Sequence, residues 1–171
     1  MCAAYSAAMA LLEPDATVAQ PTWLDRQTDF SGAGGSEIVF RNVGTKPLRL
    51  CVALLADGSN KLDSSIEWHE ISLYRAVSGQ FAVALRFVRA TSLESTIHRA
   101  RVFETMDDAA TWLETFDPIA DLSADFDVSD IRLSAARVAL KASALRDRAE
   151  RLDRAYRVLV GEVLYRLATD S

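Results

Sequence analysis

The segment 131–168 places apolar residues at alternating steps of three and four positions through five heptads. This spacing predicts one long helix with a continuous apolar seam, and Ser129 is the expected N-cap. At 1.5 Å per residue the helix would be roughly 55 Å long, which exceeds the width of a small sheet domain. The predicted seam contains Ile131, Val138, Ala142, Leu145, Ala149, Leu152, Tyr156, Leu159 and Val163. We therefore expect the helix to associate with a second copy of the chain or with a helical protein partner.

The other faces of this helix are charged, with nine basic and four acidic residues between positions 131 and 168. A basic helix can lie along phosphates or on an anionic partner. Pairs such as Glu150 and Arg154 are instead spaced to form salt bridges along the helix itself. The acidic connector 117–130 can neutralise the remaining positive charge. Both interpretations remain open at the level of the sequence.

Residues 70–89, EISLYRAVSGQFAVALRFVR, alternate in the manner of two antiparallel strands. Ser78 and Gly79 predict the tight turn between them. The core face would be formed by Ile71, Leu73, Val77, Phe81, Val83, Leu85 and Phe87. The opposite face would be exposed to water, as in a sheet covered on one side. This expected wet face carries Ser72, Tyr74, Gln80, Ala82, Ala84 and Arg86.

Two further strand patterns flank this pair. The runs EIVF and PLRLCVALL, with a turn at Gly44 between them, predict an earlier hairpin that ends at the turn signal Asp57-Gly58. A last strand over 96–105 leads into a helix. Thr105 would cap that helix, with Asp108 as its reciprocal partner.

The helix that follows Thr105 is amphipathic. Ala109, Trp112, Leu113 and Phe116 are spaced i, i+3, i+4 and i+7, so one face of the helix is apolar. The helix is expected to end at Pro118. A helix with this single apolar face is suited to cover one side of the sheet.

Together these elements predict an α+β fold. It consists of a small antiparallel sheet of three to five strands in a β-meander, one covering helix, and a long C-terminal amphipathic helix. We expect residues 1–36 to form a short helix followed by a loop, and residues 37–116 to form the sheet and its covering helix. The acidic connector 117–130 and the heptad-patterned helix 131–168 would follow.

Two runs within residues 71–116, YRAVSGQFAVALR and ARVFETMDDAATW, resemble the AP2-type DNA-binding domain. The shared features are a tyrosine-arginine strand start, a glycine turn, and a phenylalanine-x-threonine strand end that enters an acidic, alanine-rich helix. In that family the exposed face of the sheet reads bases in the major groove. The resemblance implies that Arg75, Arg86, Arg99 and Arg101 are the candidate nucleic-acid contacts.

The residues most often used in catalysis or metal binding are few and scattered. Cys2 is expected to be a terminal thiol and Cys51 a buried core thiol. Two separate cysteines are too few for a metal site, and free thiols fit a reducing cytoplasm. His69 and His98 are expected at the surface or rim of the sheet, because spacing identifies no triad or metal partner for either. We therefore expect no enzyme activity, no metal and no cofactor.

These patterns favour a cytoplasmic, bacterial, non-enzymatic interaction or assembly protein that acts through the C-terminal helix. The alternative is a DNA-binding accessory or regulatory protein, dimerised by that helix, with the arginine-bearing face of the 71–105 sheet on DNA. The net charge of −5 provides no overall basic field for nucleic acid. No apolar run approaches the roughly 18 residues that a membrane span needs.

Overall fold

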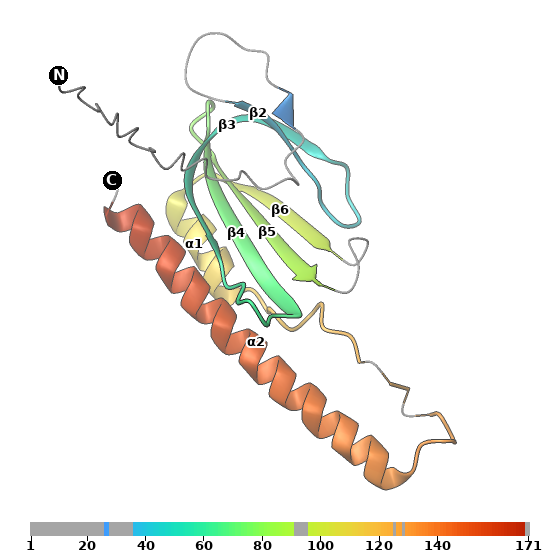
Figure 1. Cartoon of the computed structure of the whole chain (residues 1–171). Coiled ribbons are helices and arrows are strands. Elements are labelled where there is room, and N and C mark those ends of the chain that lie inside the picture. The colour runs from blue at the N-terminus through green and yellow to red at the C-terminus, as the bar shows by residue number, and fades with distance from the viewer. Residues whose placement is uncertain (1–25, 28–35, 91–95, 125, 128, 170–171) are drawn as a thin grey trace, which may run out of the picture.

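The structure, a computed structural model, describes residues 26–27, 36–90, 96–124, 126–127 and 129–169. Its strands form one antiparallel sheet in the order β1-β2-β3-β4-β5-β6 (Figure 1). They are β1 (Arg26–Gln27), β2 (Ser36–Phe40), β3 (Leu48–Ser59), β4 (Glu67–Ala76), β5 (Phe81–Arg89) and β6 (Ile97–Phe103). The helices are α1 (Met106–Thr115) and α2 (Ala135–Thr169). The predicted α+β class, with a meander, a covering helix and a long C-terminal helix, is confirmed.

The expected helix within 1–13 lies outside the described residues, as does most of the expected loop 14–36. Within that loop, however, β1 pairs antiparallel with β2, so the region contains one short strand. The expected turn between β4 and β5 is confirmed. Gly79 has a φ of +90°, a conformation that glycine adopts without steric cost, and its N–H donates to the carbonyl of Ala76.

The predicted start of α1 is confirmed at Thr105. Its hydroxyl accepts a hydrogen bond from the backbone N–H of Asp108 at 3.1 Å and donates to the Asp108 carboxylate at 2.7 Å. Asp107 and Asp108 lie in the first turn, where their negative charges interact favourably with the positive end of the helix dipole. Ala109 and Leu113 are fully buried against the sheet, so α1 covers the sheet with its apolar face as expected.

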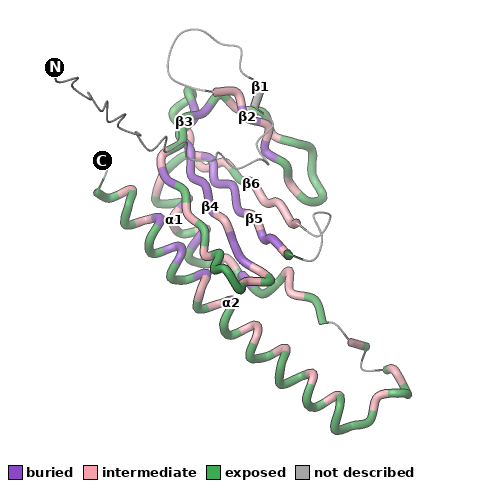
Figure 2. Tube along the Cα trace, in the orientation of Figure 1, coloured by how far each residue is buried: buried purple, intermediate pink, exposed green. Residues whose placement is uncertain are grey.

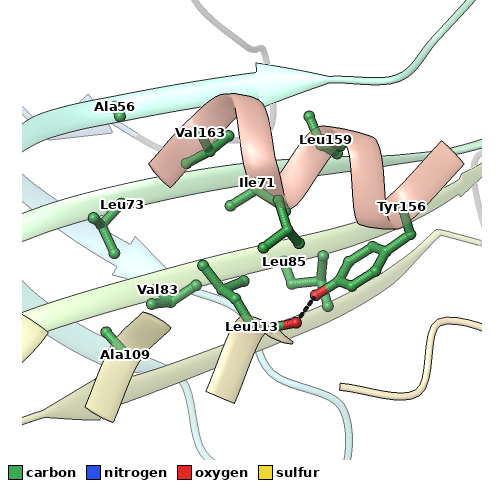
Figure 3. Close-up of a cluster of buried hydrophobic side chains, with 11 residues drawn as sticks. Ala56, Ile71, Leu73, Val83, Leu85, Ala109, Leu113, Tyr156, Leu159 and Val163 are labelled. Atoms are coloured by element: carbon green, nitrogen blue, oxygen red, sulfur yellow. Dashed lines mark hydrogen bonds between the residues drawn. The ribbon is translucent and has the colours of Figure 1, made fainter. Parts of the chain in front are cut away.

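The main hydrophobic core lies between one face of the sheet and the two helices. Leu73 and Val83 from the sheet meet Leu113 from α1 and Leu159 and Val163 from α2 there (Figure 3). In the same view, the Tyr156 hydroxyl donates a hydrogen bond of 2.9 Å to the carbonyl of Leu113. This bond joins α2 to the last turn of α1 inside the core.

The opposite face of the sheet is not wet, which corrects the prediction from alternation. Tyr74, Ala82 and Ala84 are all buried in a second core, where Phe40 of β2 packs edge-on against Tyr74 with 5.2 Å between ring centroids. β3 lies between β2 and β4, and a flat sheet would hold strands two apart at roughly 9.5 Å. The sheet therefore curls strongly, and the backbone N–H of Val43 after β2 reaches the carbonyl of His98 in β6 at 2.9 Å.

The turn expected at Asp57-Gly58 is also absent, because β3 continues through both residues to Ser59. Gly58 serves the packing of α2 instead. A Cβ atom at this position would lie 2.8 Å from Leu159 Cδ1 and 2.9 Å from Val163 Cγ2. The missing side chain lets α2 approach the sheet closely at this point.

Candidate interaction surface on the C-terminal helix

The two ends of α2 have different surroundings. Its buried residues all lie in the C-terminal half, where Leu152, Tyr156, Leu159 and Val163 of the predicted seam are buried. Figure 2 shows burial confined to that half, while the first half extends past the sheet and is exposed or half-buried. About half of the predicted seam is therefore used inside the chain itself.

The helix also begins later than predicted. The first helical residue is Ala135, and Ser134 is the N-cap, because its carbonyl accepts from the N–H of Val138 at 3.0 Å. Ser129 instead bonds to the carboxylate of Asp127. Ile131 consequently lies before the helix and is 98% exposed, so it is not part of a helical seam.

The first half of α2 retains the other members of the predicted seam. Val138, Leu145 and Ala149 are half-buried, Ala142 is exposed, and none of them belongs to either hydrophobic core. The connector touches this half through Phe126, whose ring centre is 5.6 Å from the Lys141 ammonium group. About four turns of helix thus carry an apolar stripe beyond the edge of the sheet.

A groove of about 880 Å³ runs between α2 and the β3–β4 loop. One wall is the loop 59–66 and the other is α2 from Arg148 to Glu162. Leu62, Ile66 and Val158 line this groove, and they are 70%, 61% and 61% exposed. Neighbouring exposed apolar residues in a concave surface are typical of a site that another molecule covers.

The groove is held open by fixed contacts. Arg148 of α2 donates two hydrogen bonds to the carboxylate of Glu67 at the start of β4, one of them at 2.6 Å. In the loop, the N–H of Leu62 donates to the Ser65 hydroxyl, and the N–H of Ser65 donates to the carbonyl of Leu62, both at 2.9 Å. These contacts give the wall a defined shape before any partner binds, and such preorganisation lowers the entropy cost of association.

His69 is buried rather than at the surface, and only 1% of it is exposed. Its odd position in β4 places it on the helix-covered face, where its ring is 5.0 Å from that of Phe87 and 5.1 Å from that of Tyr156. Neither ring nitrogen has a hydrogen-bond partner among the described residues. Burial lowers the pKa of His69 to about 4, against the opposing charges of Asp121 and Glu67. The imidazole is therefore neutral at physiological pH.

The described residues around His69 form a narrow gap without space for a water molecule. His98 is half-buried, and its pKa is lowered by burial first and then by the charges of Arg86 and Arg41. Cys51 is exposed, which corrects the expectation of a core thiol. Its neighbour Val52 takes the core-facing position of β3.

The four candidate nucleic-acid contacts do not share one surface. Strand register places Arg75, Arg99 and Arg101 on the face that the helices cover, and Arg86 on the opposite face. Arg86 lies 3.4 Å from the carboxylate of Glu70. The Nε of Arg99 donates to the carboxylate of Asp121 at 3.0 Å. The AP2-type resemblance therefore stays a prediction, and no single surface that carries all four arginines supports it.

Comparisons with protein-family models, with curated proteins and with solved structures found no significant match. Within the described part of the chain, no helix is both long and apolar enough to cross a membrane. No cluster of three or more histidine, cysteine, aspartate or glutamate residues suited to a metal ion occurs among the described residues. The helix surface and its groove are thus the features that carry a functional argument.

Proposed function

We propose that the protein is a non-enzymatic interaction or assembly protein that acts through α2. The observation that carries this proposal is the extension of α2 beyond the sheet. The helix spans Ala135–Thr169, about 52 Å at 1.5 Å per residue, but its buried residues begin only at Leu152. The first half is exposed or half-buried and still keeps the apolar spacing of the second.

In an isolated monomer such an extension gains little stability from tertiary packing. Short helices are marginal in water without tertiary packing, and most helical stability in proteins comes from burial of an apolar face. Val138 and Leu145 continue the register of Leu152 along that face. A second copy of the chain or a helical partner would bury them, and it would stabilise the extended half at the same time.

The test is to replace the seam residues of the extended half by charged residues. We expect Val138→Glu and Leu145→Glu to abolish self-association or partner binding while the sheet domain stays folded. Ala139→Glu is the matched control, because it introduces the same charge at an exposed neighbouring position of α2. Light scattering after size-exclusion chromatography measures the mass, and circular dichroism verifies the fold.

Two results would contradict the proposal. One is a monomeric wild-type chain, at a concentration on the order of 50 µM, that captures no protein partner. This concentration exceeds the micromolar dissociation constants of weak but specific complexes. The other is an assembly that both seam variants leave unchanged. An assembly lost equally in Ala139→Glu would show general damage to the helix and would remove the support for the seam.

A further inference from the structure

The side of α2 that lines the groove has a second regular pattern. Arg151, Ala155, Val158 and Glu162 follow one another at intervals of four, three and four residues, and all four line the groove. We call these four residues the groove face. They lie about a quarter turn around the helix from the seam residues that enter the main core, since the helix turns by roughly 100° at each residue.

The groove face is complementary to itself when two copies run antiparallel. The interval order four-three-four is the same from either end, so two antiparallel helices bring Arg151 opposite Glu162 and Ala155 opposite Val158. A positive side chain then meets a negative one, and a small side chain meets a larger one. A two-fold axis repeats each contact, as in other isologous dimers.

Resting on the proposed role of α2 in assembly, we propose that a second copy of this chain occupies the groove, as a contact separate from the one that buries Val138 and Leu145 of the extended half. The α2 helices of the two copies lie antiparallel, each in the groove of the other, with two reciprocal Arg151–Glu162 ion pairs. Leu62 and Ile66 of each loop cover the helix that docks beside them. This arrangement buries the exposed side chain of Val158 at its centre.

The charges of the groove favour a second copy over an unrelated peptide. Arg151 and Glu162 are both exposed, and no ion pair joins either of them to another described residue. An acidic peptide would satisfy Arg151 but would be repelled by Glu162, and a basic peptide would have the reverse conflict. A partner that carries both charges in inverted order pairs with Arg151 and Glu162 at once, and a second copy of the same helix provides that order.

The size of the groove agrees with this occupant. From Arg148 to Glu162 the groove runs along about four helical turns, roughly 21 Å. The ion pair of Arg148 with Glu67 fixes the loop wall beside the helix. A groove that is already open suits a rigid helix better than a compact small molecule.

Charge exchange tests the pairing directly. Arg151→Glu places two acidic residues opposite each other in the dimer, and Glu162→Arg places two basic residues opposite each other. Each single variant should raise the dimer dissociation constant at least about tenfold, because facing like charges repel. An equimolar mixture of the two variants should restore dimers, because both pairs of the mixed dimer join opposite charges. The glutamate introduced at position 151 of one chain faces the arginine introduced at position 162 of the other, and the unchanged Arg151 and Glu162 face each other. The double variant should dimerise like the wild type.

Arg146→Glu is the matched control for charge. Arg146 is exposed on α2 and does not line the groove, so its replacement should leave the dissociation constant within about threefold of the wild type. Sedimentation velocity over a dilution series measures each variant, and labelled chains detect the mixed dimer. Circular dichroism verifies that α2 stays helical.

The outcomes separate this inference from the proposed function. A wild-type dimer that ignores both single charge changes overturns the groove dimer. If Leu145→Glu still dissociates that dimer, assembly through α2 stands with a different contact. A monomeric wild type that binds a partner more tightly after Glu162→Arg would mean that an acidic protein occupies the groove. A monomer without any partner overturns both.

Discussion

His69 should make the stability of the protein fall as the solution becomes acidic. The folded protein holds its imidazole between Phe87 and Tyr156 without a hydrogen bond to a described residue, and burial lowers its pKa from 6.5 to about 4. The unfolded chain takes up a proton near pH 6.5, whereas the folded chain does so only near pH 4. The contribution of His69 is therefore complete above pH 6.5 and is lost as the pH falls to 4. At about 1.36 kcal/mol per pH unit, the loss is about 3 kcal/mol.

The measurement is the free energy of unfolding by urea at pH values from about 7.5 to about 3.5, a range that brackets both pKa values. His69→Phe should abolish most of the decrease between pH 6.5 and 4. At neutral pH it should be neutral or stabilising, because it removes two buried polar atoms without partners. His98→Gln should keep most of the decrease. Carboxylates also titrate in this pH range, but they are the same in wild type and both variants, so the difference between the curves reports on the histidine. An identical decrease in His69→Phe and wild type would refute the reasoning.

Two substitutions test the contact between α2 and the rest of the chain. Gly58→Ala should destabilise the fold by about 1–3 kcal/mol in urea unfolding, because the new Cβ would press on Leu159 and Val163 at 2.8 and 2.9 Å; an unchanged midpoint would mean that α2 sits less closely on β3. Tyr156→Phe should cost about 1–2 kcal/mol, because it leaves the buried carbonyl of Leu113 without its 2.9 Å hydrogen bond. Equal stability of Tyr156→Phe and wild type would place water at that carbonyl.

Local signals predicted the local structure well. The Thr105 cap with Asp108 and the Gly79 turn depend on residues within a few positions of one another, and each is found where the sequence places it. Alternation along β4 and β5 also identified the core face, where Leu73 and Val83 are fully buried, although Val77, which follows the end of β4, is 76% exposed. These features need no knowledge of distant parts of the chain, because short-range geometry determines them.

The errors arose where distant segments meet. The expected wet face is buried because Phe40 reaches Tyr74 across β3 when the sheet curls, and alternation cannot report on curl. Asp57-Gly58 is a common turn sequence, but in this structure Gly58 leaves space for the side chains of Leu159 and Val163, which belong to a helix about a hundred residues later. His69 is buried because the rings of Phe87 and of Tyr156, from a helix far along the chain, pack against it. In each case tertiary packing decided the outcome.

The same limit applies to the heptad pattern of α2, and it explains how the helix can serve both the fold and assembly. A regular apolar spacing shows which side of a helix is buried, but not which surface buries it. In this chain the answer changes along the length, because Tyr156 and Leu159 pack on the sheet whereas Val138 and Leu145 extend past it. The domain therefore fixes the direction of the helix and leaves its first half available. A partner bound there would meet a helix whose orientation is already set by the core, so that less conformational freedom is lost on binding.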